Sequence, residues 1–547
     1  MMQRLVFLWP EVSLFATTCI VMVLGLSRSV SLRRSTAFVA GMGIALSGAL
    51  AVLTTPVGAG VVAEAGQTIL PNLPMYGKTI VAVVGLLLLL LSAGTVDRRE
   101  EAAIAAGKMA YDALRMNRAE YYAFFLFSLT GLMLCAGADD LIWLFLALEL
   151  TSLPTYIMVT ISTQRNRSRE AGVKYFFLGA LGAAVFLFGF ALVYGGTGTT
   201  NLNAIRTAIA DHGLNPIALA GVLVTLVGLG FKIAAVPMHF YTADVYEGAA
   251  PQVSAFLAFV PKTAGFFSIL LLVGAVGWQH SGTMGGGPAL PDPVRVLLWV
   301  VAGMTMTVGN VLAILQHSVK RILAYSSIAH SGYMLVGVIA GPGDGTFGQN
   351  GVAAVLFYLL AYGIMNAGVF GVLAALEHAP APGGDGEPRE VETVDDLRGL
   401  VHTQPMLGWA MVLCSLSLLG FPPLLGFFGK LPLFTSAIAA DEIPLVIVLG
   451  LNSAIAAFYY LRLMSAPLLE ARGEGQPVAT PAPFPTRALA AAVAGLGVVL
   501  LAIPAGQLMR ASATAGAYTR QEALPQVHVP GPAKADPEDS GVAPVAP

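Results

Sequence analysis

Residues 225–251 read TLVGLGFKIAAVPMHFYTADVYEGAAP, and residues 415–434 read SLSLLGFPPLLGFFGKLPLF. Each stretch places a Gly-Phe step, prolines and one lysine, Lys232 or Lys430, inside an apolar run. A proline within a helix removes a hydrogen bond and clashes with the preceding turn, so both helices should be interrupted. In a membrane, such interruptions persist only where protein or water satisfies the freed backbone groups. The two stretches therefore predict two broken membrane helices, each with a charge beside the break.

The composition is typical of a multi-pass membrane protein. Of the 547 residues, 56% are hydrophobic and 11% are charged, and the mean hydropathy is +0.75. Soluble domains carry about 25% charged residues. The formal net charge of −2 provides no basic field for nucleic acid. Cys19, Cys135 and Cys414 fall in separate apolar runs without a metal-binding spacing, so we expect free thiols and no metal site.

Apolar runs long enough to cross a bilayer recur fourteen times along the chain. They cover approximately residues 5–26, 36–54, 78–96, 119–137, 140–162, 171–195, 216–236, 251–276, 294–315, 322–340, 351–376, 406–436, 443–466 and 485–508. The sequence thus predicts an all-α membrane protein of about fourteen spans.

Basic residues collect in the loops that follow odd-numbered spans. Arg33 and Arg34 follow the first span, Arg165 follows the fifth, and Lys320 and Arg321 follow the ninth. The loops after even-numbered spans are nearly free of lysine and arginine. By the positive-inside rule, the odd-numbered loops are cytoplasmic and both termini lie on the outer side.

The two broken spans are the seventh and the twelfth. Interrupted spans at matching positions of two halves are typical of inverted-repeat transporters, and an odd-length repeat inserts its second copy upside down. The sequence therefore predicts five-helix repeats over 119–276 (spans 4–8) and 294–466 (spans 9–13), with ordinary proline kinks as the alternative. Elsewhere we expect a three-helix segment over 1–96, an amphipathic cytoplasmic helix over 97–118, a polar acidic loop over 377–404, a last span over 485–508, and a disordered Pro/Ala-rich tail over 511–547.

Five ionisable side chains lie inside the predicted spans, namely Glu149, Lys232, Lys262, His330 and Lys430. A charged group at the bilayer centre costs about 3 kcal/mol on insertion scales, so such residues usually mark an ion or proton pathway. A lysine can lose its proton there and act as a relay, whereas an arginine would stay charged. Static ion pairing, snorkelling and core packing are the alternatives.

Three further residues are secondary candidates. His239 follows the proline of the seventh span and could stand at a proton entrance. Tyr325, together with the serines next to it, could order water near His330. Lys174 lies near a span end, where contact with lipid headgroups explains it better than a buried role.

Four stretches resemble a known family. They read DDLIWLFLALELTSLPTYIMV (139–159), GFKIAAVPMHFYTADVYEGAAPQVSAFLAFVPKTAGF (230–266), VKRILAYSSIAHSGYML (319–335) and GFPPLLGFFGKLPLF (420–434). These are similar to the antiporter-like membrane subunits of respiratory complex I, the NADH-quinone oxidoreductase. Within that family, the segment 244–251 most resembles the N subunits, the bacterial counterparts of mitochondrial subunit 2.

The resemblance implies fourteen helices, two inverted five-helix repeats and broken seventh and twelfth spans, in a bacterial inner membrane. It implies proton translocation coupled to quinone reduction elsewhere in the complex. The family's functional positions fall on Glu149, Lys232, Lys262 and Lys430, and His330 matches a histidine position. A Glu149–Lys232 pair would control the charge of that lysine, and Lys430 would serve the exit side.

The resemblance also implies which cofactors and partners to expect. This chain should bind no cofactor or metal itself, while FMN, iron–sulfur clusters and quinone belong to partner subunits. Its partners would be the other membrane subunits of the complex. Pro261, directly before the lysine of the eighth span, departs from the family's more usual small residue. A subunit of an Mrp-type cation/proton antiporter and a non-transporting membrane scaffold are the alternatives.

Overall fold

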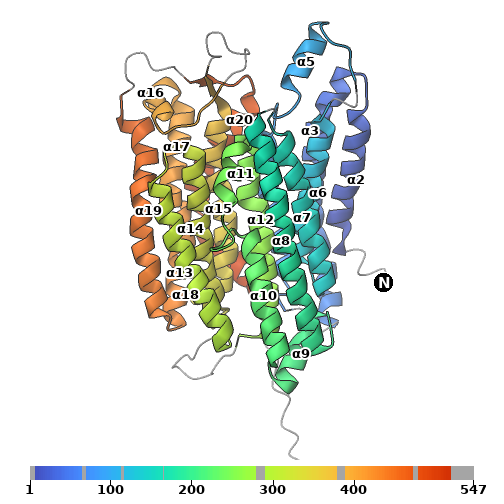
Figure 1. Ribbon diagram of the computed structural model, residues 1–547, viewed down its shortest axis with the longest axis vertical. Helices are drawn as coiled ribbons and strands as arrows, with labels where there is room; N and C mark the ends of the chain where they lie inside the picture. Colours follow the sequence, from blue (N-terminus) through green and yellow to red (C-terminus); the bar gives the residue numbers. More distant parts are fainter. Residues whose placement is uncertain are drawn as a thin grey trace, which may run out of the picture.

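The computed structural model describes residues 7–64, 69–112, 116–163, 165–278, 290–378, 389–471 and 479–518. Its helices stand side by side along the long axis of the molecule (Figure 1). Among the described residues, ten helices are long and apolar enough to cross a membrane, and α20 with α21 makes an eleventh candidate that is bent by 90°. The prediction of a multi-pass helical membrane protein is confirmed.

In the described residues up to Trp278, the structure has eleven helices. These are α2 (Trp9–Gly25), α3 (Val30–Glu64), α4 (Leu73–Leu91), α5 (Arg98–Ala105), α6 (Arg118–Ala136), α7 (Leu141–Ile161), α8 (Asn166–Thr197), α9 (Leu202–His212), α10 (Pro216–Lys232), α11 (Thr242–Gly248) and α12 (Pro251–Val276).

The described residues from 290 onward add further helices and three short strands. The helices are α13 (Asp292–Ile314), α14 (Val319–Ala340), α15 (Gly351–Ala375), η2 (Asp395–Leu397), α16 (Leu400–Thr403), α17 (Pro405–Leu419), α18 (Leu425–Ala439), α19 (Ile443–Leu469), α20 (Pro485–Leu500) and α21 (Ala505–Ala515). The strands β1 (Leu376–His378), β2 (Arg389–Glu390) and β3 (Thr480–Pro481) form an antiparallel sheet in the order β2-β1-β3.

Polar caps and prolines set many of the helix ends. Asp140 accepts a hydrogen bond from the Ile142 N–H at the start of α7, and Asn350 caps α15 in the same way. Pro251 occupies the first position of α12, where its missing N–H costs nothing. Gly277, with φ of 94°, ends that helix. These local signals explain why the hydropathy-based limits 251–276 coincide with α12.

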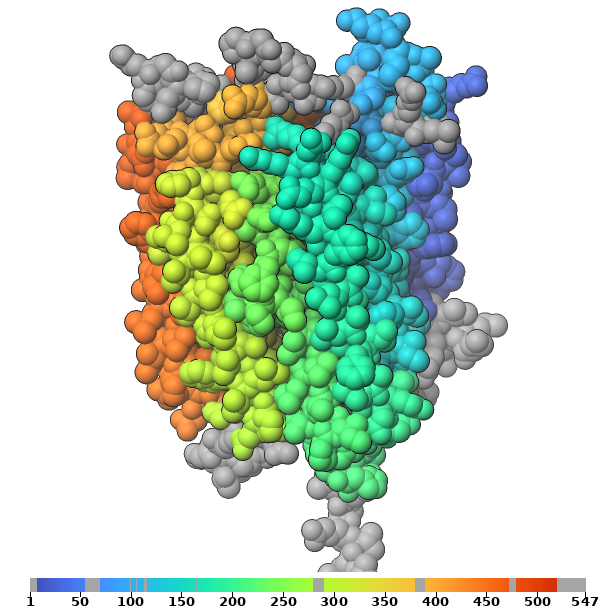
Figure 2. Space-filling model, in the orientation of Figure 1, coloured from blue at the N-terminus to red at the C-terminus, as the bar shows by residue number. Residues whose placement is uncertain are grey.

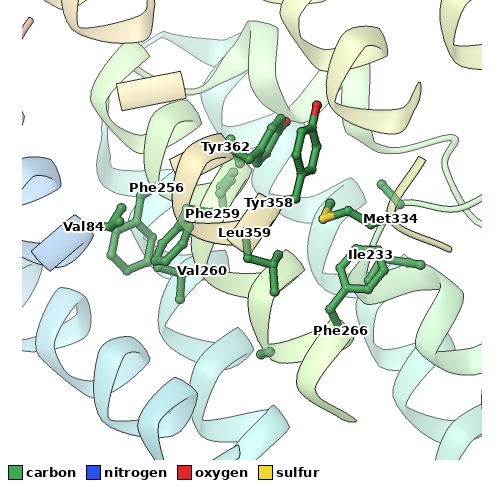
Figure 3. Close-up of a cluster of buried hydrophobic side chains, with 14 of the residues drawn as sticks. Val84, Ile233, Phe256, Phe259, Val260, Phe266, Met334, Tyr358, Leu359 and Tyr362 are labelled. Carbon is green, nitrogen blue, oxygen red and sulfur yellow. The ribbon is translucent and has the colours of Figure 1, made fainter. Parts of the chain in front are cut away.

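Three helices form the centre of the molecule. Every residue of α12 and of α15 is buried, and in α14 only Arg321 and Tyr325 are not. A helix that is apolar all round is stable only inside a large core. Figure 3 shows this core, in which Phe256 and Phe259 of α12 lie near Tyr362 of α15.

The outer helices present apolar side chains to their surroundings. Phe177 on α8 is 67% exposed and Leu451 on α19 is 61% exposed, which suits a lipid-facing surface. In Figure 2 the teal-to-green side chains of the α8–α10 region and the yellow-green ones of the α13 region cover one face of the molecule. The ionisable candidates of the central helices are therefore enclosed by a ring of apolar helices.

The two ends of the molecule differ. Helices α5 and α16 lie at one end, and α9 lies at the opposite end (Figure 1). The sheet belongs to the first of these, because Arg98 at the start of α5 forms an ion pair of 2.7 Å with Glu377 of β1. We refer to them below as the α5 end and the α9 end.

Both predicted interruptions are present. Helix α10 ends at Lys232, and the chain resumes as α11 at Thr242. Helix α17 ends at Leu419, and α18 begins at Leu425.

Two expectations from composition differ from the observed elements. Among the described residues of the amphipathic helix expected over 97–118, helix α5 covers Arg98–Ala105, and Gly107 follows it in the left-handed region with φ of 71°. In the tail expected over 511–547, the first residues belong to helix α21, which ends at Ala515. Residues 519–547 lie outside the described part of the chain. Short helices that dock on a larger body depend on packing, and composition alone does not show this.

Candidate functional site: a buried line of ionisable side chains

The break after α10 is held by side chains of neighbouring helices. The Val236 N–H donates to Oγ1 of Thr305 on α13, at 3.0 Å. The Ser331 hydroxyl on α14 donates to the carbonyl of Ile233. These bonds satisfy backbone groups that the interruption frees within the membrane region. The break beside Lys232 is therefore stabilised by specific hydrogen bonds within the core.

Lys232 forms an ion pair with Glu149 of α7. Its Nζ lies 3.0 Å from Oε1 of Glu149 and 2.6 Å from Oγ of Ser152, and it sits 5.5 Å from the centre of the Phe186 ring. The Lys232 side chain is 1% exposed and that of Glu149 is 19% exposed. The lysine is thus enclosed, while its carboxylate partner extends toward the surface of the subunit.

Lys262 lies on the wholly buried helix α12. Its ammonium donates to the Ser327 carbonyl and, at 2.6 Å, to the Ser327 hydroxyl on α14. The ring of Tyr362 lies beneath it, with 4.9 Å between Nζ and the ring centre. Helix α12 continues through the neighbouring Pro261 without a break. The groups that contact this ammonium are thus neutral, and the Ser327 hydroxyl is close enough to exchange a proton with it.

His330 lies between two tyrosine hydroxyls. Its Nδ1 is 2.6 Å from the hydroxyl of Tyr358 on α15, and its Nε2 is 2.7 Å from the hydroxyl of Tyr460 on α19. The Tyr460 hydroxyl also bonds to the Ser326 hydroxyl. Figure 3 shows Tyr358 and Tyr362 side by side. Since each of these groups can both donate and accept, the set can pass a proton along its hydrogen bonds.

Lys430 lies beside the second break. From α18 its Nζ donates to the carbonyl of Leu419, the last residue of α17, at 2.8 Å, and the Tyr333 ring lies 5.0 Å away. A cation at this position stabilises the free carbonyls and the negative end of the helix. Gly420 has φ of 91°, and a Cβ there would stand 2.9 Å from the Lys430 side chain.

The four sites are linked through α12 and α14. A Cβ built on Gly265 of α12 would lie 3.0 Å from Cβ of Lys232. Since Gly265 is one helical turn from Lys262, the backbone of α12 beside Lys262 packs against Lys232. On α14, Ser327 contacts Lys262, and His330 follows three residues later. A further three residues along, Tyr333 contacts Lys430. Helix α14 thus contacts Lys262, carries His330 and contacts Lys430 within two turns.

The secondary candidates lie outside this line. His239 is 9% exposed in the linker between α10 and α11, and its ring packs against Phe240, which is 72% exposed. The Lys174 side chain is 43% exposed and pairs with Asp244 at 2.9 Å. Tyr325 is partly buried on α14, in a position that packs against the hydrophobic core.

Several polar groups of the core were not found by sequence reasoning. In the sequence, Tyr358 and Tyr460 look like ordinary core aromatics in an apolar span. The one signal available is the i, i+4 spacing of Tyr358 and Tyr362, which places these two side chains on the same face of a helix. A second enclosed ion pair, Lys78 with Glu11 at 2.8 Å, joins α4 to α2. Lys78 stands at the first position of its predicted span, where snorkelling is the ordinary reading.

Within the described ranges, no group of three or more His, Cys, Asp or Glu side chains is placed to hold a metal ion. Cys19, Cys135 and Cys414 are free thiols.

The fold and the site together define a multi-pass helical membrane protein with ionisable groups in its core. Residues 138–456 match the family model described as NADH:quinone oxidoreductase/Mrp antiporter, TM. NADH-quinone oxidoreductase subunit N of Trichlorobacter lovleyi is 40% identical over 400 residues, covering 73% of this chain and 74% of that protein. NADH-quinone oxidoreductase subunit N 2 of Roseiflexus castenholzii is 42% identical over 397 residues, covering 71% and 74%. The chain therefore belongs to the antiporter-like family of NADH-quinone oxidoreductase subunit N.

Solved structures agree with this assignment. A chain of respiratory complex I from Thermus thermophilus superposes with a TM-score of 0.71 at 29% identity, over 92% of this chain and 99% of that one. A chain of the Mrp complex from Dietzia sp. has a TM-score of 0.71 at 21% identity, over 94% and 97%. The second likeness shows a shared fold only.

Proposed function

We propose that this chain is a proton-translocating membrane subunit of a bacterial NADH:quinone oxidoreductase. The observation that carries the proposal is the enclosed line Lys232–Lys262–His330–Lys430 between two broken helices. Buried ionisable groups of this kind in a membrane protein are costly and serve transport. In this proposal, FMN, iron–sulfur clusters and quinone belong to partner subunits, and this chain contributes ionisable side chains. Other membrane subunits of the complex are its neighbours.

The finer architecture is part of the same proposal. Counting α10 with α11, and α17 with α18, as one broken span each gives fourteen spans when α2 and α20 are included. Spans 4–8 (119–276) and 9–13 (294–466) would then be inverted copies, each with its break in the fourth helix. A lysine beside each break supports this pairing.

The α5 end is proposed to face the cytoplasm, with both termini on the outer side of the inner membrane. Basic side chains of the odd-numbered loops gather there through shared acidic partners. Arg33 and Arg118 both approach Glu101, and Arg165 and Lys320 both approach Glu390. This clustering is what the positive-inside rule predicts for a cytoplasmic surface.

Each member of the line would have a distinct role. Glu149 holds the charged form of Lys232, and separation of the two would free a proton to move to Lys262. From Lys262 the proton would pass to the Ser327 hydroxyl and the His330–tyrosine set. Lys430, on the α9 side of the second break, would deliver it to the outer side. Because Glu149 extends toward the surface, charges on a neighbouring subunit could act on the first step.

Replacing Lys262 with methionine tests the proposal. Inside-out membrane vesicles that carry Lys262→Met should retain NADH oxidation but lose proton uptake, because methionine cannot carry a proton. Lys174→Met is the matched control, since Lys174 is an exposed surface lysine. Normal uptake per NADH oxidised in the Lys262→Met vesicles would contradict the relay.

An Mrp-type cation/proton antiporter is the weaker candidate. The likeness to the Mrp complex is one of fold alone, whereas relatives at 35–42% identity are NADH-quinone oxidoreductase N subunits. Sodium–proton exchange without NADH and quinone would favour the antiporter instead.

A further inference from the structure

Each of the three buried lysines of the line lies over the face of an aromatic ring. Measured from Nζ to the ring centre, the three pairs are Lys232 with Phe186 at 5.5 Å, Lys262 with Tyr362 at 4.9 Å, and Lys430 with Tyr333 at 5.0 Å. The rings come from α8, α15 and α14, so no single local motif produces the pattern. An ammonium within about 6 Å of a ring centre is attracted by the negative face of the ring. The proposed function does not yet use these rings.

The positive charge of Lys262 is stabilised by neutral groups. A lysine ammonium has three N–H donors. Two of them donate to the carbonyl and the hydroxyl of Ser327. Among the described residues, no carboxylate forms an ion pair with Lys262, and the Tyr362 ring is the aromatic face that its ammonium contacts. The ring of Tyr362 is therefore the group that remains to stabilise the third side of this ammonium.

A ring suits a proton relay better than a carboxylate does. A buried ion pair favours the ammonium over the amine by about a hundredfold or more. The attraction between an ammonium and a ring in a water-poor site is weaker, about tenfold to thirtyfold. A lysine over a ring therefore keeps its proton in the core but still releases it, whereas a lysine fixed to a carboxylate releases its proton slowly.

The ring that faces Lys430 is fixed by a buried polar network. The Tyr333 hydroxyl accepts from Nδ2 of Asn310 at 2.9 Å and donates to the carbonyl of Asn452 at 3.2 Å. Oδ1 of Asn310 in turn accepts from the Tyr459 hydroxyl at 3.0 Å. All four of these side chains are buried. A polar network whose members are bonded to one another in the core is rigid, so the orientation of the Tyr333 ring toward Lys430 is fixed.

The ring that faces Lys262 also contacts the next member of the line. The centre of the Tyr362 ring is 5.1 Å from that of the His330 ring and 6.4 Å from that of the Tyr358 ring, which stacks beside it (Figure 3). Tyr362 is 1% exposed, and Phe186, the ring beside Lys232, is fully buried. Close packing leaves such rings little freedom to turn their faces away from the lysines.

We propose that Phe186, Tyr362 and Tyr333 are positioning residues of the relay, and that the electron-rich face of each ring sets how readily its lysine holds a proton. The inference rests on the proposed function, because the rings act through the three lysines. The hydroxyl groups of Tyr362 and Tyr333 are secondary in this respect, and Phe186 has none. The ring of Tyr362 has the largest effect, since the hydrogen-bond partners of Lys262 are neutral groups of Ser327.

Stepwise fluorination of the ring at position 362 tests the proposal. Tyr362→Phe is the reference, and phenylalanines with one, two and three ring fluorine atoms are incorporated at the same position. Fluorine withdraws electron density from the ring face and changes the volume of the side chain little, so it separates the attraction from packing. Inside-out vesicles of the whole complex are used, and proton uptake per NADH oxidised is measured. The control is the same series at Phe357, which is also buried on α15 and packs against the Phe347 ring.

Uptake should fall with each fluorine atom at position 362 and reach about a tenth of the Tyr362→Phe value with three. The series at position 357 should stay level. Equal uptake across the series at position 362 would overturn the proposal, because the ring would then act through its volume alone. A Tyr362→Phe complex that pumps no better than Lys262→Met would overturn it too, because the hydroxyl rather than the ring face would be the group required.

A second series at Phe186 keeps the test decisive if a fluorinated side chain at position 362 prevents assembly, which immunoblots of the complex establish. The parent residue there is already phenylalanine, so no hydroxyl is lost. Uptake should again fall with each fluorine atom, but less steeply, because Glu149 also stabilises charged Lys232. A level series at Phe186 would overturn the proposal. Normal uptake in Lys262→Met would contradict the proposed function, whereas loss in Lys262→Met with level fluorine series would contradict the role of the rings alone.

Discussion

The Glu149–Lys232 pair allows a worked prediction. Glu149→Gln removes the carboxylate that lies 3.0 Å from Lys232 and preserves the size of the side chain. Breaking a fully buried ion pair costs about 3–5 kcal/mol. Here the Glu149 side chain is 19% exposed, and Ser152 keeps its contact with Lys232 at 2.6 Å. We therefore expect the interaction that stabilises charged Lys232 to weaken by about 2 kcal/mol. This corresponds to about a thirtyfold change in the equilibrium between the charged and neutral forms of the lysine.

The assay is proton uptake per NADH oxidised in vesicles of the assembled complex. Glu149→Gln should reduce this ratio clearly, because the first relay would no longer be filled at the correct stage. Glu170→Gln is the control, since Glu170 pairs with Lys174 at 2.8 Å on the exposed surface, where an ion pair is worth about 0–1 kcal/mol. If both variants pumped like the parent, the pair would be a static contact and our reasoning would fail.

Three further predictions follow from the core and from the α5 end of the molecule. Tyr358→Phe and Tyr460→Phe each remove a hydroxyl partner of His330. Each variant should therefore lower proton uptake and destabilise the complex by about 1–3 kcal/mol in thermal unfolding. Uptake equal to that of the parent in both variants would exclude the two tyrosines from the proton route. Gly420→Ala places a Cβ 2.9 Å from the Lys430 side chain at φ of 91°, so uptake should fall, while Gly303→Ala, which meets open space, should not change it. Neighbouring cations lower the pKa of Glu390 below its ordinary 4.5. The ion pair of Glu390 therefore stabilises the fold fully above that ordinary value, and this stabilisation is lost as the pH falls through the lowered pKa. The difference in melting temperature between the parent and Glu390→Gln should be constant from about pH 8 to 5 and shrink only at lower pH.

The helical framework could be predicted because hydropathy and proline act locally. The run 251–276 coincides with α12, and the prolines of 225–251 and 415–434 predicted both interruptions. In contrast, within the described part of 97–118, helix α5 covers Arg98–Ala105 and does not continue through Gly107. Whether such a segment stays helical depends on packing against its neighbours, which no periodicity in its own residues reveals.

The identities of the ionisable residues could be predicted, but their partners could not. A lysine in an apolar span is conspicuous, so Lys232, Lys262 and Lys430 were evident from composition alone. Tyr460 approaches His330 from 130 residues away, and its hydroxyl cannot be told from that of any core tyrosine until the helices are packed. The same is true of Glu390, which comes from a loop and meets Lys320 at 2.9 Å.

The central claim is that Lys262 acts by releasing and taking up a proton, and Lys262→Arg tests it most directly. Arginine keeps the positive charge but does not release its proton near neutral pH. The measurement is NADH-driven proton uptake by the purified complex in liposomes, at equal NADH oxidation and equal amounts of assembled subunit. Our account predicts that Lys262→Arg loses uptake as fully as Lys262→Met. Uptake by Lys262→Arg that matched the parent would show that a fixed charge is sufficient and would contradict the account.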